Sequence, residues 1–234
     1  MYCKNYQVRY SEVDVTGKAT ISAIISYFQD TTMFHSDSVG QGIGDLMQRQ
    51  LAWLLISWHI QIYRYPEYAE ELTARTWATK FVHSYGYRDF DLLDQGGNIV
   101  AKASSIWILY DAASGKMQRV SPQIAATYSP EDRPVFSDEE PWKIRYPKEY
   151  SICYDVKIAR SFLDTNNHVN NVRYLDFILD AIPDSRRIHS LRINYKKQAV
   201  YGDIVHVCQC ADDPAIFILK TDTDVCAVIA VDKD

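Results

Sequence analysis

The stretch Leu163-Asp164-Thr165-Asn166-Asn167-His168-Val169-Asn170-Asn171 combines one carboxylate, four amides and one imidazole within nine residues. Asp164, Asn166 and His168 alternate along it, so an extended or looping backbone can turn their side chains toward one place. Asn170 or Asn171 is suited to cap the amphipathic run that follows. A base, a carboxylate and amide donors beside a helix N-terminus are the groups that acyl transfer to water requires. A polar turn without a catalytic role has a similar composition. The surrounding sequence is therefore needed to distinguish a catalytic motif from a structural turn.

The amphipathic run after this stretch has a counterpart in the first half of the chain. Apolar residues at positions 174, 175, 177 and 178 correspond to apolar residues at 24, 25, 27 and 28. Asp14 and Asp164 lie 150 positions apart, as do Asp30 and Asp180. Both runs have the spacing of a helix with one apolar face. The chain is therefore predicted to be an internal duplication.

Strand-like runs follow each predicted helix, separated by turn residues such as Gln95-Gly96-Gly97-Asn98. A short apolar helix followed by many strands buries its face against a sheet. Each half is thus predicted to be an α+β unit with one helix and an antiparallel sheet. The predicted strands are Leu51–Tyr63, Glu71–Phe81, Tyr85–Asp94, Ile99–Asp111, Met117–Val120, Ile188–Lys197, Ile204–Cys210, Ala215–Thr221 and Val225–Val231.

A polar, proline-rich segment from Ser129 to Pro141 separates the halves and is predicted to be an extended linker. We therefore predict one domain over residues 1–140 and a second over residues 141–234.

Composition narrows the class of protein. The 234 residues are 47% hydrophobic, which is enough for a sizeable core. A net charge of −5 argues against a nucleic-acid partner, and no apolar run is long enough to span a membrane. The N-terminal residues lack the apolar core of a secretory signal, so we expect a cytoplasmic protein. The five cysteines are odd in number and lack metal-ligand spacing, so we expect no metal and no cofactor.

The motif and its context resemble one family. Residues 163–174 are similar to the signature L-D-x-N-x-H-V-N-N-x-x-Y of acyl-acyl carrier protein thioesterases, which have a double hot-dog fold. Further matches in the same order run through the first half: Gln29–Ser36, Gly40–Gly44, Trp53, Arg64–Pro66, Thr76–Trp77, Arg88–Phe90 and Ala103–Trp107. The resemblance implies that the second hot-dog carries the catalytic groups and that the first shapes much of the acyl tunnel.

Carried over by position, Asp164, Asn166 and His168 match the family's catalytic aspartate, asparagine and histidine. Gln198 stands where the family has a glutamate, and Ala199 stands where many plant members have a cysteine. Ala199 cannot act as a nucleophile, and Gln198 cannot accept a proton but can hold a water. The predicted mechanism is therefore direct attack of water on the thioester, with His168, or Asp164 through it, taking the proton. Asp164 is expected to orient the imidazole or to stabilise its cation.

The other histidines are expected to be structural. His35, near the end of the first predicted helix, is expected to interact as a cation with the helix C-terminus. His59 lies in an apolar predicted strand, and His83, His189 and His206 have no cluster of catalytic or metal-binding residue types near them in the sequence.

The resemblance implies hydrolysis of acyl-acyl carrier protein to a free fatty acid in fatty acid biosynthesis. Acyl-CoA hydrolysis remains an alternative, as does a non-hydrolytic acyl-binding role given Gln198; a hydratase or dehydratase is a further option. Acyl carrier proteins are acidic, and the candidate docking residues are Arg186, Arg187, Arg192, Lys196 and Lys197. Ordinary solvated surface is the alternative interpretation of these residues. Because the tandem repeat supplies a hot-dog pair within one chain, a monomer is as feasible as a homodimer.

Overall fold

A computed structural model describes residues 1–136, 142–146, 149–182 and 188–233. Contacts divide the chain into two compact units. The first comprises Met1–Ile56 and Ile60–Glu140, and the second comprises Ser57–His59 and Pro141–Asp234. Each unit is described by itself below.

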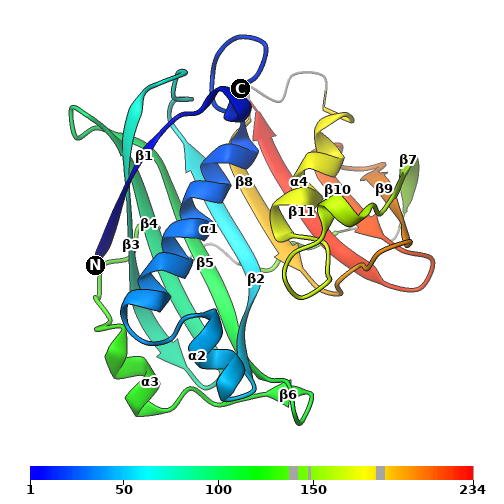
Figure 1. Cartoon of the computed structure of the whole chain (residues 1–234). Coiled ribbons are helices and arrows are strands. Elements are labelled where there is room, and N and C mark those ends of the chain that lie inside the picture. Colours follow the sequence, from blue (N-terminus) through cyan, green and yellow to red (C-terminus); the bar gives the residue numbers. More distant parts are fainter. Residues whose placement is uncertain (137–141, 147–148, 183–187, 234) are drawn as a thin grey trace. The chain divides into compact units, whose positions relative to one another are not determined.

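The first unit is a long helix set against an antiparallel sheet (Figure 1). Its strands run in the order β1-β3-β4-β5-β2, and β6 pairs with β5. Helix α1 covers one face of this sheet. The elements are β1 (Tyr2–Gln7), the 3₁₀ turn η1 (Tyr10–Glu12), α1 (Ile21–Ser38), α2 (Ile43–Gln48), β2 (Leu51–Ile62), β3 (Glu71–Val82), β4 (Tyr85–Asp94), β5 (Ile99–Asp111), β6 (Lys116–Met117) and α3 (Pro122–Thr127).

Helix α1 begins where Thr20 caps it, since the Thr20 hydroxyl accepts the backbone N–H of Ala23 at 3.2 Å. Its apolar stripe includes Ile24 and Phe28, both without exposed surface. The ring of Phe28 lies 5.2 Å from that of Phe90 on β4. Burying side chains of this size contributes about 2 kcal/mol each, so the helix is held by its packing on the sheet.

The second unit repeats this plan with a shorter helix (Figure 1). Its strands run in the order β8-β11-β10-β9-β7. Adjacent strands in this order pair antiparallel. The elements are β7 (Tyr150–Lys157), the 3₁₀ turn η2 (Arg160–Phe162), α4 (Asn171–Leu179), β8 (Ile188–Tyr195), β9 (Ile204–Cys210), β10 (Ile216–Lys220) and β11 (Val225–Lys233). Each unit is thus the α+β hot-dog that the sequence predicts.

The predicted duplication extends to the backbone hydrogen bonds of the two units. Asp14 N–H donates to Lys18 O at 2.8 Å, and Asp164 N–H donates to His168 O at 2.8 Å. In both units a strand and a 3₁₀ turn precede this loop, and a helix follows it. A difference of 150 positions therefore relates equivalent residues here.

Some elements were missed by the prediction. The strands β1 and β7 were not predicted because they lie at the sheet edges, where exposed polar residues interrupt the apolar pattern. The short helices α2 and α3 were also missed. The strand predicted over Met117–Val120 is wrong in extent, since only Lys116–Met117 forms β6.

The polar segment after α3 packs against β3 and β4 of the first unit. Val135 N–H donates to the buried Asp89 carboxylate at 2.8 Å. The Arg133 guanidinium contacts Asp91 at 3.3 Å and lies 4.7 Å from the centre of the Trp77 ring. Residues 137–141 of the predicted linker lie outside the described residues. In the part of the chain that is described, no helix is long and apolar enough to cross a membrane.

Candidate active site

The predicted motif forms a tight loop organised by Asp164. Its Oδ1 atom accepts the backbone N–H of Asn166 at 2.8 Å and that of His168 at 3.2 Å. A bridge between Leu163 and Val169 closes the loop. Asn167 takes a positive φ of 61° at the loop tip, a conformation that asparagine tolerates better than most residues. The loop therefore has one defined geometry that sets where His168 lies.

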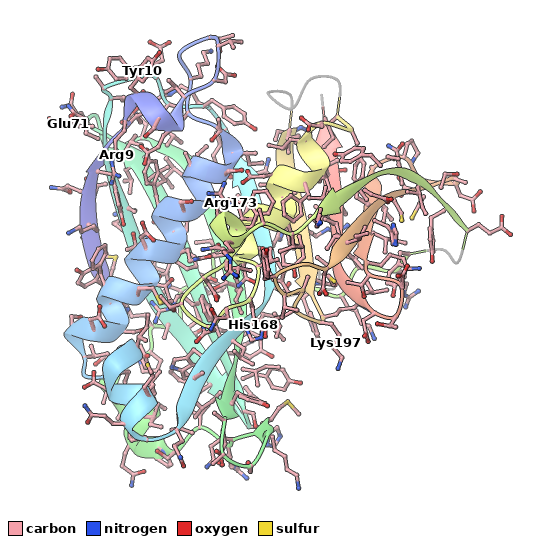
Figure 2. The ribbon with its side chains drawn as sticks, turned by 45° about the vertical axis from the view of Figure 1, so that its right-hand side comes forward. Arg9, Tyr10, Glu71, His168, Arg173 and Lys197 are labelled. Atoms are coloured by element: carbon pink, nitrogen blue, oxygen red, sulfur yellow. The ribbon has the colours of Figure 1, made fainter. Side chains whose placement is uncertain are left out.

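The helix that follows the loop begins as the sequence predicts. Asn170 is the N-cap of α4, and its side-chain oxygen accepts the backbone N–H of Val172 at 3.1 Å. The apolar face of α4 is buried. Figure 2 shows His168 on the loop that leads into α4, with Arg173 in the first turn of the helix. The base candidate is thus fixed next to a helix N-terminus.

Gln198 is brought next to this loop by backbone pairing. His168 forms an antiparallel bridge with Val200, and Val169 N–H donates to Ala199 O at 3.0 Å. Val169 and Ala199 are buried, whereas the residues on either side of each are more exposed. Side chains two apart on extended backbone share a face, so Gln198 lies on the face that carries His168.

The imidazole of His168 has unused hydrogen-bonding capacity. Its Nδ1 atom is buried and has no hydrogen-bond partner among the described residues. A buried ring nitrogen without a partner costs free energy unless a ligand or water satisfies it. This atom is therefore a natural contact for a molecule bound at the site.

The structure places the four predicted site residues on two segments joined by backbone pairing, and it changes the expected role of one. Asp164 uses Oδ1 to hold backbone N–H groups, and no hydrogen bond joins its carboxylate to the His168 ring among the described residues. Asp164 therefore orients the loop, and through it the imidazole. Asn166 and Gln198 are exposed, whereas Asp164 and His168 are half-buried.

The equivalent loop of the first unit has the same backbone hydrogen bonds but different side chains. Asp14 Oδ1 accepts the N–H groups of Thr16 at 2.7 Å and Lys18 at 3.4 Å, and Gly17 takes the positive φ of 78°. Thr16 and Lys18 stand where the second unit has Asn166 and His168. The fold thus builds this loop without a histidine, so the presence of His168 needs a reason other than folding.

The expectation for His35 is wrong. Burial lowers the pKa of His35 to about 3, with a further contribution from Arg88, so the ring is neutral and cannot act as a cation at the end of α1. Its Nδ1 atom lies 2.8 Å from Nη1 of Arg88, which is itself buried. Since a guanidinium can only donate, Nδ1 is the acceptor.

The proposed docking residues are only partly described. Arg186 and Arg187 lie outside the described residues. Lys196 Nζ donates to Tyr146 Oη at 3.1 Å and lies 4.9 Å from the centre of its ring. Lys197 is exposed on the segment after β8 (Figure 2).

Two tyrosines connect α4 to the segment bearing Gln198. The backbone N–H of Ala199 donates to Tyr174 Oη at 2.9 Å. Tyr195 Oη donates to the backbone oxygen of Asn171 at 2.9 Å. The resemblance marked Tyr174 as the last residue of the motif, but only the fold reveals its partner.

Two family models match the chain. The acyl-ACP thioesterase N-terminal domain matches residues 1–128, and the acyl-ACP thioesterase C-terminal domain matches residues 145–227. Among similar sequences, oleoyl-acyl carrier protein thioesterase 2 of Arabidopsis thaliana is 28% identical over 94% of this chain and 65% of its own length. A palmitoyl-acyl carrier protein thioesterase of Cuphea hookeriana is 24% identical over 85% of this chain and 52% of its own length. The chain thus spans less than two thirds of these relatives.

Solved structures agree on the fold. An acyl-ACP thioesterase from Bacteroides thetaiotaomicron superposes with a TM-score of 0.89 at 21% identity, covering 99% of this chain and 97% of the other. The 12:0-ACP thioesterase from Umbellularia californica gives a TM-score of 0.85 at 19% identity, covering 100% and 96%. With both halves of the chain matched by family models and the predicted hot-dog fold confirmed, this chain belongs to the acyl-ACP thioesterase family.

Proposed function

We propose that this protein hydrolyses acyl-acyl carrier protein, releasing a free fatty acid and the carrier thiol by direct attack of water. The observation that carries the proposal is the buried, unpartnered Nδ1 atom of His168 on the face that also bears Gln198. Membership of the family and the names of the relatives support the substrate class.

In this mechanism Gln198 and His168 hold the attacking water. The water oxygen bonds to the thioester carbonyl carbon while His168 takes one proton. The tetrahedral intermediate then collapses with cleavage of the carbon–sulfur bond, and the imidazolium returns its proton to the leaving thiolate. No acyl-enzyme forms at position 199, because Ala199 has no nucleophile.

The developing oxyanion needs a donor, and the side-chain amide of Asn166 on the loop is suited to provide it. One well-placed donor contributes on the order of 3 kcal/mol to lowering the barrier. Asp164 holds the loop that carries both Asn166 and His168. Its negative charge also stabilises the imidazolium that forms during the reaction.

Thiol release from acyl-carrier substrates of graded chain length tests the proposal, with His168→Ala as the inactive control. The expected result is turnover by the wild type and loss of most of it in the folded variant. Near-normal turnover by His168→Ala would remove His168 from the mechanism.

Gln198 favours one second candidate, a non-hydrolytic acyl-binding protein, because the family's glutamate is absent at this position. Tight binding of an acyl-carrier substrate without appearance of free thiol would establish that role. A larger kcat/KM for acyl-CoA than for the carrier-linked acyl group would instead identify a CoA thioesterase. The cytoplasmic location and the choice between monomer and homodimer stay predictions, to be tested by cell fractionation and light scattering.

A further inference from the structure

Two hydrogen bonds hold the backbone of Ala199, the residue after Gln198. The N–H of Ala199 donates to Tyr174 Oη at 2.9 Å, and the carbonyl oxygen of Ala199 accepts the N–H of Val169 at 3.0 Å. Ala199 has no exposed surface, and Tyr174 is 1% exposed. Water therefore cannot replace either bond cheaply. These two bonds fix the backbone at Gln198 relative to His168, the residue before Val169.

Tyr195 adds a second connection between the same two elements. Its hydroxyl donates to the backbone oxygen of Asn171, the first residue of α4, at 2.9 Å. The rings of Tyr174 and Tyr195 lie 6.0 Å apart. Burial raises the pKa of both tyrosines, so both hydroxyls stay protonated over the pH range of an enzyme assay. Together they join the start of α4 to the segment that carries Gln198.

The first unit shows that the fold does not need this connection. Ala19 N–H donates to Pro66 O at 2.7 Å, just as Val169 N–H donates to Ala199 O. Pro66 is therefore the counterpart of Ala199, and proline has no N–H that needs an acceptor. At the position of Tyr174 the first unit has Ile24.

The first unit also lacks a tyrosine at the position equivalent to Tyr195. Tyr195 lies as many positions before Ala199 as the buried Ile62 lies before Pro66, so Ile62 is its counterpart. The first unit thus has the same fold with isoleucines in place of the two tyrosines and a proline in place of Ala199. The tyrosine hydroxyls and the N–H that one of them binds occur only in the unit that contains His168 and Gln198.

We propose that Tyr174 is a positioning residue that holds the Gln198 side chain at the distance from His168 needed to bind the attacking water. This inference rests on the proposed hydrolase function. Tyr174 does not touch the substrate; its hydroxyl acts through the peptide bond between Gln198 and Ala199.

The test is Tyr174→Phe, with Tyr27→Phe as the matched control. Tyr27 is also a buried helix tyrosine, and its hydroxyl donates to Glu12 Oε2 at 2.6 Å in the unit without the proposed site. Because small displacements of reacting groups are costly, we expect Tyr174→Phe to lower kcat about tenfold or more with little change in KM. Tyr27→Phe should leave kcat unchanged, and both variants should lose some thermal stability.

A double-mutant cycle with Gln198→Ala separates positioning from general damage. Once the Gln198 side chain is absent, its placement no longer matters, so Tyr174→Phe should lower kcat less than about threefold in that background. Equal losses of kcat in the two backgrounds would overturn the proposal. Retention of wild-type kcat by folded Tyr174→Phe would overturn it as well.

Amide hydrogen exchange at Ala199 provides a readout that does not depend on activity. Exchange at this amide should accelerate in Tyr174→Phe and stay slow in Tyr27→Phe; unchanged exchange in Tyr174→Phe would contradict the inference. If the single variant does not fold, Tyr174→Phe combined with Ala199→Pro removes the N–H that lost its acceptor, as Pro66 does in the first unit. Its kcat should remain low, and a wild-type value would overturn the proposal.

The proposed function can fail separately from this inference. Absence of thioester hydrolysis by the wild type would reject the hydrolase proposal before any variant is compared. Hydrolysis by the wild type together with full activity of Tyr174→Phe would reject the positioning role alone.

Discussion

Asp164 contacts His168 at its backbone N–H and not at its ring: Asp164 Oδ1 accepts the His168 N–H at 3.2 Å, while His168 Nδ1 has no hydrogen-bond partner among the described residues. The same turn occurs in the first unit, where Asp14 accepts the backbone N–H of Lys18. The carboxylate therefore has a structural task in both units. In the second unit, the residue whose N–H it accepts is the proposed base, and we propose that its charge stabilises the imidazolium.

Replacing Asp164 by asparagine or alanine separates these two contributions. Asparagine keeps an Oδ1 acceptor, so the free energy of unfolding of Asp164→Asn should change little, whereas Asp164→Ala should lose about 1–2 kcal/mol. Without the charge, the imidazolium is less stable, and we expect kcat of Asp164→Asn to fall on the order of tenfold. Alanine should lower kcat further because the loop also loosens. Urea unfolding and thiol-release assays measure both effects; equal unfolding free energies for the two variants would exclude the turn as the role of Asp164.

Replacing Gln198 by glutamate should raise kcat. The residue lies on the face that carries His168, so a carboxylate there can share the proton of the attacking water. The acidic limb that a histidine base gives the pH profile should shift to lower pH in Gln198→Glu, because a carboxylate, which has a lower ordinary pKa than imidazole, then shares the role of base. The control is Gln123→Glu on α3, which makes the same charge change at an exposed position in the first unit. An unchanged or lower kcat for Gln198→Glu would show that a carboxylate is not useful here.

Much of the fold could be predicted from the sequence because its strands alternate with clear turn signals. The bounds of β4, β5 and β9 agree with the predicted runs to the residue. The edge strand β7 could not be predicted, since most of its residues are exposed and it lacks an apolar face. Edge strands take their conformation from the neighbour they pair with, which local pattern does not reveal.

The positions of the candidate site residues could be predicted more readily than their hydrogen-bond partners. The motif placed Asp164 and His168 in one loop, but alternation of side chains could not show that Asp164 binds backbone N–H groups. The bond from Ala199 N–H to Tyr174 Oη joins residues 25 positions apart. It depends on how the segment after β8 packs on α4, and no spacing rule reports such a contact.

His35 should make the protein less stable in acid. Its pKa is about 3 in the folded state and about 6.5 when unfolded, mainly because of burial, so the unfolded chain binds a proton that the folded chain does not. Its contribution to stability is therefore complete above pH 6.5 and declines as the pH falls toward 3. His35→Gln keeps an acceptor for Arg88 and cannot titrate. Chemical unfolding at pH 7 and pH 4.5 should show the wild type losing more stability than this variant, and parallel losses would contradict the assignment.

His206 should have the opposite pH dependence. Its Nδ1 lies 2.6 Å from Asp155 on β7, and its Nε2 lies 3.0 Å from Asp222, in the turn between β10 and β11. Hydrogen bonds to these carboxylates raise the pKa of His206. Because the folded state holds the proton more tightly, the added stability is complete below pH 6.5 and is lost as the pH rises through the folded-state pKa.

The melting temperature of the wild type should therefore exceed that of His206→Gln by more at pH 6 than at pH 9. High salt should shrink the difference, since both carboxylates are exposed and their charges are screened. Asp222→Asn removes one of the two carboxylates and should reduce the difference between pH 6 and pH 9 without abolishing it. A gap between wild type and His206→Gln that is the same at both pH values would show that this histidine contributes through packing and not through its charge.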